Sequence, residues 1–378
     1  MKILDRYVLV TFFKNYLISF LVLVGLYIAL DMVFNFDDLV EPPKAMATSI
    51  STPQIIFDIA GYYAYQTPAI FAYLSGIIAV VGAAFTLLRL SRFNEVTAVL
   101  AAGVPLLRVA APIIVAGVAL NGVLIADQEL LLPHIMFKIV RSHEEMHIAT
   151  PKSFPIQLMQ DDHKGLLSAA SYTPPGDGRP AKIDFLDVVE RDDQLRPRGH
   201  LQADMAVYDT HAKLWRLTNG LHVSILQPQP TGRQMPAHVE VYKSNITPDE
   251  IALWRGGEYV QLLATSRINQ LLERQESYGT VNLLRVKNFR ITQPLANVIL
   301  LLLAVPMVLK RDPGQLKSGA VKCLFLSGAC MGCTFIAYQL AATPPSPEWM
   351  ARWPATMAWL PIFIFGPLAV WLLDRVKS

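Results

Sequence analysis

Cysteine is scarce and unevenly placed in this sequence. Among 378 residues there are only three cysteines, Cys323, Cys330 and Cys333, and all three lie in one apolar stretch near the C-terminus. A disulfide framework in the long polar middle of the chain is therefore excluded. The Cys330-x-x-Cys333 spacing matches redox and zinc motifs, but a second such pair is missing and the neighbouring residues are apolar. We expect these cysteines to pack between helices.

Charged residues are also few. Asp, Glu, Lys and Arg make up 17% of the chain and apolar residues make up 53%, a composition that does not fit a purely soluble enzyme. The net charge is only +3, and the basic residues are scattered between apolar runs instead of clustering as they do in nucleic-acid-binding proteins. The composition predicts a membrane protein with no nucleic-acid partner.

A phosphate-binding loop is absent as well. No Gly-x-x-x-x-Gly-Lys-Ser/Thr run occurs in the sequence, and this is the loop that cradles nucleotide phosphates in P-loop ATPases. We therefore expect no nucleotide and no other cofactor in this chain.

Long apolar runs are what the sequence has instead. Six of them approach the length of about 20 residues that a helix needs to span a bilayer. They fall into two groups of three: Tyr16–Phe34, Thr67–Leu88 and Val109–Ala126, then Ile291–Leu309, Cys323–Ala342 and Ala355–Leu373. The first run follows a basic start like that of a signal peptide, but no small-residue cleavage site comes after it, so we expect it to be retained. The predicted plan is three membrane helices in residues 1–136, a separate domain in 137–286, and three membrane helices in 287–378.

Basic residues are distributed asymmetrically around these runs. If the N-terminus is inside the cell, the short cytoplasmic segments carry twelve Lys and Arg residues, and the opposite short loops carry only Lys44 and Arg352. Basic residues are retained on the cytoplasmic side of a membrane. Both termini are therefore predicted to be cytoplasmic, and residues 137–286 are predicted to lie outside, which in a bacterium is the periplasm.

The middle section has stretches in which apolar and polar residues largely alternate. Lys182–Val189, Leu214–Leu226 and His238–Tyr242 have the period of half-buried strands, and Pro- and Gly-rich turns separate them. Asn219-Gly220, inside the second stretch, is a hairpin turn signal. We predict an antiparallel β domain; the pattern is compatible with a sandwich, a jelly roll or an open curled sheet.

A short amphipathic helix is predicted between the second and third apolar runs, near residues 94–103. Asn94 can cap its first amide groups, Glu95 lies at the positive end of its dipole, and Gly103 can end it. Its apolar ridge has the spacing i, i+3, i+4, i+7 and consists of Val96, Val99, Leu100 and Gly103. Such a helix either docks into a soluble partner or lies on the lipid surface.

This segment resembles the coupling helix of the LptF/LptG (YjgP/YjgQ) permease family. It reads Leu-Ser-Arg at 90–92, then an acidic residue, then Ala-Ala-Gly at 101–103. Residues 127–133 and 288–310 also resemble the family, and the order of three helices, β domain and three helices covers the whole chain. The resemblance implies that the middle domain is an open β-jelly roll.

The resemblance further implies a function and a set of partners. In that family two permease chains, here a second LptF/LptG-like chain or another copy of this one, enclose a cavity of lipid size. A pair of cytoplasmic ABC ATPase subunits grips the coupling helices and drives the extraction of lipopolysaccharide, or a related glycolipid, from the inner membrane. The lipid then passes to a periplasmic bridge protein. This chain would be a subunit with no catalytic residues of its own.

Particular residues acquire expected roles in this scheme. Glu95 would pair with a basic group of the ATPase, supported by the apolar ridge of the helix near 94–103. The first and fifth membrane helices form gates in the family, so Gly328 and Gly332 are candidates either for a gate or for helix packing inside one subunit. Asn121 and Gln339 are polar residues within apolar runs and are expected to hydrogen-bond between helices.

The lipid head group presents a departure from the family pattern, because basic groups are expected near the outer end of the first helix. This chain has acidic residues there: Asp31, Asp37, Asp38 and Glu41. Either the partner permease supplies the positive charge, or Arg285, Lys287 and Arg290 do, or the lipid differs. The acidic group can also be a solvated helix end.

The alternative from another class of protein is a membrane-anchored zinc metalloprotease. Residues 143–147 match H-E-x-x-H, in which His143 and His147 would bind the metal and Glu144 would activate water. Such a short pattern occurs by chance fairly often, Pro151 ends the helix soon afterwards, and no third ligand is evident. No other metal site is predicted.

Overall fold

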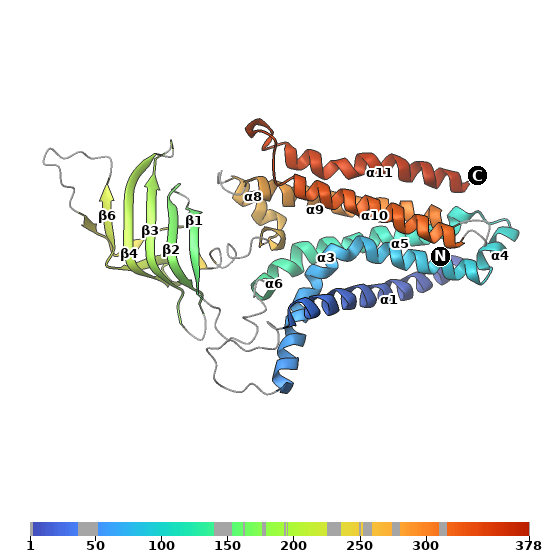
Figure 1. Cartoon of the computed structure of the whole chain (residues 1–378), viewed down its shortest axis with the longest axis horizontal. Coiled ribbons are helices and arrows are strands. Elements are labelled where there is room, and N and C mark those ends of the chain that lie inside the picture. Colours follow the sequence, from blue (N-terminus) through green and yellow to red (C-terminus); the bar gives the residue numbers. More distant parts are fainter. Residues whose placement is uncertain are drawn as a thin grey trace.

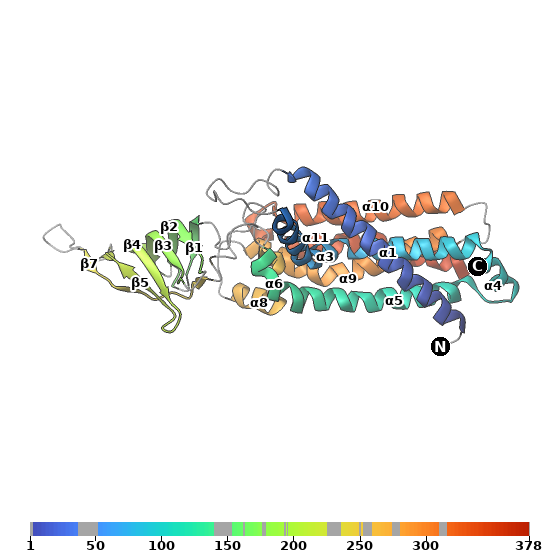
Figure 2. The ribbon, with the colours of Figure 1, turned by 90° about the horizontal axis from the view of Figure 1, so that it is seen from below.

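The computed structural model describes residues 3–36, 52–139, 153–161, 163–175, 179–192, 194, 196–224, 236–248, 251, 259–273, 280–309 and 316–377. These residues form a bundle of long helices and a β sheet that lie one beyond the other along the longest axis of the molecule (Figures 1 and 2). The end of the bundle nearer the sheet is named the sheet end. The opposite end, which carries the short helix α4 and both ends of the chain, is named the α4 end.

Six helices of the described chain are long and apolar enough to cross a membrane. They are α1 (Ile3–Phe34), α3 (Thr52–Arg92), α5 (Leu106–Ala126) with its continuation η1 (Asp127–Leu131) and α6 (Leu132–Ile139), α9 (Thr280–Val308), α10 (Leu316–Leu340) and α11 (Trp353–Lys377). Each contains nearly all of one predicted apolar run, which confirms the prediction of six membrane helices. The helices extend beyond those runs because polar residues outside the lipid can continue a helix.

The helices differ in how much of their apolar surface the chain itself covers. Within the most apolar stretch of each helix, 61% of α3 and 50% of α9 is buried, against 11% of α1 and 22% of α10. α3 and α9 are therefore the centre of the bundle. α1 and α10 present large apolar faces outward, including Leu21, Val22, Leu324 and Phe325. These two faces meet lipid or another chain.

Small residues bring the central helices together. A Cβ atom added to Gly82 of α3 would lie 3.0 Å from the Tyr16 Cα atom of α1, and one added to Gly117 of α5 would overlap the Leu301 side chain of α9. Such close approaches are how helices associate in a membrane, where no hydrophobic effect drives them together.

The β domain is a single sheet in the described part of the chain. Its strands are β1 (Phe154–Gln160), β2 (Leu166–Thr173), β3 (Lys182–Arg191), β4 (Pro197–Asp209), β5 (Leu214–Thr218), β6 (Leu221–Ser224), β7 (Ala237–His238) and β8 (Val241–Tyr242). All pairs are antiparallel, and β1 to β5 follow one another in chain order. The antiparallel β domain predicted between two groups of three helices is confirmed, and its sheet is visibly curved (Figure 1).

The Asn219-Gly220 turn is not a hairpin, so that prediction was wrong. β5 and β6 do not pair with each other; both pair with β4, through Met205 with Thr218 and Gln202 with Leu221. Asn219 and Gly220 therefore interrupt the strand that pairs along β4, and Asn219 adopts a φ of 54°. The hairpin turn lies at residues 210–213, where the Asp209 carboxylate accepts backbone N–H bonds that hold the pKa of this carboxyl below its usual value.

A line of unusual backbone conformations crosses the sheet. Leu158 on β1 has a φ of 44°. Phe185 on β3 and Asn219, which lies between β5 and β6, each have a φ of 54°. Positive φ is strained for such bulky residues. On β3 the alternation of buried and exposed side chains shifts by one residue near Phe185. Ile183 and Leu186, which are three residues apart, are both fully buried. The phase change lets the sheet bend while its apolar side chains stay on one face.

Gly220→Ala is expected to destabilise the β domain by about 1–3 kcal/mol, because the added methyl group would overlap the backbone carbonyl oxygen of Val239, which cannot rotate away. Hydrogen exchange of the β4 and β6 amides should report faster opening. Gly122→Ala is the control, since its Cβ would meet nothing within 4 Å. Equal exchange in both variants would contradict this packing.

The return from the sheet to the bundle is helical. The turn η3 (Tyr259–Leu262), helix α8 (Thr265–Glu273) and the first turns of α9 fall within the range 137–286 that was predicted as the middle domain. They pack together in an apolar cluster that includes Val260, Ile268 and Val286, against Met136 of α6. The strands occupy only residues 154–242, and the segment after them lies with the membrane helices. A further turn, η5 (Pro347–Trp349), connects α10 to α11.

Candidate functional site

Helix α4 (Glu95–Ala101) lies at the α4 end, between α3 and α5 (Figure 1). The helix ends where Gly103 predicted that it would, and Gly103 adopts a φ of 76°. The Gly103 amide donates to the Leu100 carbonyl at 2.9 Å, and the Val104 amide donates to the Val99 carbonyl at 3.1 Å. This pair of bonds is a Schellman motif, which satisfies the last carbonyl groups of the helix.

Asn94 does not cap α4 with its side chain, so that part of the prediction was wrong. Asn94 has φ 57°, in the left-handed region that Asn tolerates, and its side chain makes no cap hydrogen bond. Only its backbone carbonyl contributes, by accepting the Ala98 amide at 3.0 Å. A side-chain cap requires an extended backbone at this position.

The apolar ridge of α4 faces inward. Val96 is only 3% exposed, and Val99 and Leu100 are half-buried against the apolar core of the bundle. The chain's own core therefore covers this ridge, which seats α4 on the bundle. Amphipathicity shows that a face is buried but not what covers it, and the part of the ridge in supporting a partner contact stays a prediction. Gly103, the fourth residue of the ridge, is exposed.

The outward side of α4 carries a residue that sequence reasoning missed. Phe93, in the turn before the helix, is 65% exposed, and Thr97, Ala98 and Ala101 beside it are exposed too. Together these four residues are named the outer face of α4. The sequence offers one signal for Phe93. It is an aromatic residue that follows the basic Arg92 in a loop outside the apolar runs.

Glu95 is tied to the first membrane helix. Its Oε1 atom accepts a hydrogen bond of 3.0 Å from the Tyr7 hydroxyl group of α1. A second tie lies close by in sequence, where Arg108 of α5 is 3.6 Å from Asp5 of α1. Both contacts are partly exposed and individually weak, yet they join the start of α1 to the two elements that flank residues 102–105. A movement of α4 would therefore reach α1 directly.

At the sheet end, Arg290 of α9 is engaged within the chain. Its side chain is only 8% exposed and lies 3.3 Å from the Glu129 carboxylate. It also donates to the carbonyl groups of Leu263 at 2.6 Å and Gln261 at 2.8 Å, and to the Thr265 hydroxyl group at 3.3 Å. A guanidinium that is buried and bonded in this way does not present itself to a lipid head group, so Arg290 does not fit the role predicted for it.

Glu129 also binds the first residue of helix α8. It lies in η1, a π-helical turn of the kind often found at functional positions. Its Oε2 atom accepts the Thr265 backbone amide at 2.9 Å, and its Oε1 atom accepts the Thr265 hydroxyl group. Thr265 is the first residue of α8, so Glu129 caps the positive end of that helix from a different part of the chain. Arg290, Glu129 and Thr265 are named the sheet-end clasp.

The other two predicted head-group residues are less constrained. The Arg285 guanidinium stacks 4.4 Å from the centroid of the Tyr338 ring of α10 and donates to Asn282 at 2.6 Å. Lys287 is half-buried on the same helix. Of the acidic residues, Asp31 accepts a hydrogen bond of 2.7 Å from Tyr63, which ties α1 to α3, and one of 3.0 Å from the nearby Asn35.

The small residues of α10 are open. A Cβ atom added to Gly328 or Gly332 would meet nothing within 4 Å in the described chain. The space around both positions is compatible with a gate, and the choice between a gate and helix packing inside one subunit stays a prediction. Cys323 and Cys330 are buried in the apolar core, as predicted, and Cys333 packs against it.

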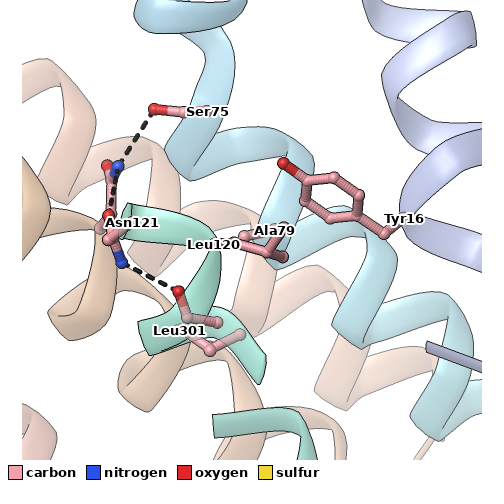
Figure 3. Close-up of a pocket in the computed structure, with 8 residues that line it drawn as sticks. Tyr16, Ser75, Ala79, Leu120, Asn121 and Leu301 are labelled. Carbon is pink, nitrogen blue, oxygen red and sulfur yellow. Dashed lines mark hydrogen bonds between the residues drawn. The ribbon is translucent and has the colours of Figure 1, made fainter. Parts of the chain in front are cut away.

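Polar side chains link three helices in the interior of the bundle. Asn297 of α9 donates to Ser75 of α3 at 3.0 Å and to Asn121 of α5 at 3.2 Å, which confirms the interhelical bond predicted for Asn121 (Figure 3). The adjoining cavity, which Tyr16 also lines, has a volume of about 10 Å³, room for one water molecule. Gln339, in contrast, is exposed on α10.

Several predicted positions lie outside the described residues: Asp37, Asp38 and Glu41 of the acidic group, and His143, Glu144 and His147 of the zinc-protease alternative. Among the residues that the structure does describe, no group of three or more His, Cys, Asp or Glu side chains could hold a metal ion.

Comparison with known proteins agrees with the architecture. No curated protein matches this chain. Residues 6–375, nearly the whole sequence, match the family described as "Lipopolysaccharide export system permease LptF/LptG". This match gives no support to the zinc-protease alternative. With six membrane helices and an antiparallel sheet inserted between the third and the fourth, the chain belongs to the LptF/LptG family of lipopolysaccharide export system permeases.

Proposed function

We propose that this chain is the permease subunit of an ATP-driven exporter that extracts lipopolysaccharide, or a related glycolipid, from the inner membrane and passes it to a periplasmic bridge protein. The observation that carries this proposal is the family match over residues 6–375. The arrangement of the molecule supports it, because the helix suited to a soluble partner and the sheet suited to lipid transfer lie at opposite ends of the bundle (Figures 1 and 2).

The α4 end faces the cytoplasm in this proposal. Arg89, Arg92 and Arg108 flank α4, and Lys322 lies in the first turns of α10. The short connection at the sheet end between α10 and α11 carries Arg352 as its one basic residue. This distribution follows the rule that basic residues stay in the cytoplasm, and it supports a periplasmic β domain with both termini in the cytoplasm.

The outer face of α4 is the surface we assign to the ATPase pair. It is exposed, contains an aromatic residue of the kind that dominates binding energy in interfaces, and is seated firmly by the buried ridge beneath it. The ATPase is a separate chain in this proposal, since this sequence has no P-loop to cradle nucleotide phosphates. Movement of α4 is passed to α1 through Tyr7 and Asp5.

A second permease chain, or another copy of this one, completes the lipid cavity. The large outward faces of α1 and α10, with the open Gly328 and Gly332, fit a wall that opens between two such chains. Arg285 and Lys287 are the residues of this chain that we propose for contact with the head group. The inward apolar face of the sheet then takes the acyl chains on their way out.

The test is affinity purification of the tagged chain from its own host in detergent, followed by mass spectrometry of proteins, lipids and metals. The proposal predicts an ABC-type ATPase and a bound glycolipid. Stoichiometric zinc without any ATPase would overturn it and would bring His143, Glu144 and His147 back into consideration.

A further inference from the structure

Residues 261–265, which follow the sheet in sequence, contact four membrane helices at the sheet end and are named the return segment. Its backbone is fixed to α9, because Arg290 donates to two of its carbonyl groups. Its last residue, Thr265, is fixed to η1 by Glu129. The Gln261 side chain reaches the other two helices. It accepts a hydrogen bond from the Tyr73 hydroxyl group of α3 and donates to the Tyr338 hydroxyl group of α10 at 2.8 Å.

Tyr338 is where the sheet end of α10 meets the rest of the chain. Besides the Gln261 bond, its ring lies under the Arg285 guanidinium, 4.4 Å from the centroid, and edge-on to Phe289 with centroids 5.0 Å apart. The neighbouring Ala337 and Ala341 are buried against Phe289 and Ala358, with which they form a small apolar cluster separate from the main core of the bundle. One aromatic side chain thus joins α10 to both α9 and the return segment.

The attachments of the return segment to α9 and to α10 differ in strength. Its bonds to α9 come from a buried, charged guanidinium and are charge-assisted, which makes them about twice as strong as neutral ones. Its bond to α10 joins a neutral amide to a neutral hydroxyl group. When the bundle moves, the contact with α10 should therefore separate first, while the return segment stays on α9.

α10 is also the helix for which such a separation is feasible. Its most apolar stretch is only 22% buried within this chain, against 50% for α9. The alanines beside Tyr338 have small, smooth side chains that do not interlock. Apart from Tyr338 and a hydrogen bond of 2.8 Å from the Trp353 indole to the Leu340 carbonyl group, the sheet end of α10 rests on apolar contacts of these small side chains.

We propose that Tyr338 is a positioning residue that latches the sheet end of α10 to the return segment, so that α10 swings away from the bundle only when the Gln261 bond is released. This rests on the proposed function, in which α10 is part of the wall that admits lipid. The latch links that wall to the β domain, because the return segment is the part of the chain that comes back from the sheet.

The latch is tested by measuring the separation of α10 from α8 in the complex purified with its ATPase. Spin labels are placed at Gln339 and Gln270, both exposed, after Cys323, Cys330 and Cys333 have been replaced by alanine. Tyr338→Phe removes only the hydroxyl group and keeps the ring under Arg285. Loss of one neutral hydrogen bond should raise the ratio of long to short distances about fivefold.

A double-mutant cycle separates a latch from simple packing. Gln261→Ala should produce the same shift as Tyr338→Phe, and the double variant should shift no further than either single one. Tyr63→Phe is the matched control, since it removes a tyrosine hydrogen bond to Asp31 between α1 and α3 and should leave the α10 distances unchanged.

Unchanged distances in Tyr338→Phe, or effects of the two substitutions that multiply, would overturn the latch. A single distance in the unaltered complex with and without ATP would do so too. In each case the unaltered chain still recovers its ATPase and glycolipid, and only the latch fails. If it recovers neither, the proposed function fails and the latch fails with it.

Discussion

The tagged Phe93→Ala variant is expected to recover at least about tenfold less ATPase than the unaltered chain. Phe93 is 65% exposed in the turn before α4 and makes no contribution to the buried ridge that seats the helix. Aromatic residues at the centre of an interface commonly contribute 2 kcal/mol or more, which corresponds to a factor above about ten in affinity. Quantitative pull-down from detergent extracts measures the effect.

Phe185→Ala is the matched control for this prediction. Phe185 is 67% exposed, almost the same as Phe93, but lies on β3 at the other end of the molecule. Its removal should leave ATPase recovery unchanged. Equal recovery with Phe93→Ala and Phe185→Ala would contradict the assignment of the outer face of α4 to the ATPase, provided that both variants insert into the membrane at the normal level.

Arg290→Met is expected to lower the free energy of unfolding of the chain by about 3 kcal/mol. The substitution removes four hydrogen bonds and leaves the Glu129 carboxylate, which is itself mostly buried, without its cation. Breaking one partner of a buried pair costs about 3–5 kcal/mol, and the lower value applies because the Glu129 side chain is 31% exposed. Unfolding in mixed micelles measures the change.

The chain offers a control with a surface ion pair. Arg216 lies 2.7 Å from Asp209 in the hairpin of the sheet, and its side chain is 67% exposed. Arg216→Met should therefore cost no more than about 1 kcal/mol. The double variant Arg290→Met/Glu129→Met should regain part of the loss, since no unpaired charge remains. A loss with Arg290→Met no greater than with Arg216→Met would show that the sheet-end clasp does not stabilise the return segment.

The six membrane helices could be predicted because apolar length alone decides whether a helix spans a bilayer. The run at Ile291–Leu309 shows the limit of that criterion. α9 begins at Thr280, and its first turns carry Asn282, Arg285, Lys287 and Arg290, which no apolar window includes. Arg290 has partners in η1, η3 and α8, and Arg285 lies over Tyr338 of α10; only tertiary structure brings these together.

The β domain shows a different limit. Asn219-Gly220 between apolar residues is as compatible with a break in a strand as with a hairpin, since both need a backbone that bulky residues avoid. The choice depends on which strand lies alongside, and β4 is long enough to pair with both segments. Local sequence does not contain that information.

Only part of the candidate site could be predicted from the sequence, for the same reasons. The position of α4, its end at Gly103 and the family resemblance around Glu95 could be read from the sequence. Which side of α4 is free could not, because the buried ridge faces the chain's own core. The partner of Glu95 within the chain, Tyr7, lies 88 residues away in sequence, and no local pattern connects the two.

In the proposed function, ATP hydrolysis by a partner moves lipid from the bundle to the sheet. A photo-crosslinking residue at Leu201, which lies in the apolar core of the β domain and is only 3% exposed, tests it most directly. In the complex reconstituted with its ATPase in vesicles that contain the glycolipid, ATP should raise the yield of lipid adduct at this position, and a non-hydrolysable analogue should not. The same yield with and without ATP, or no adduct at all, would contradict the account.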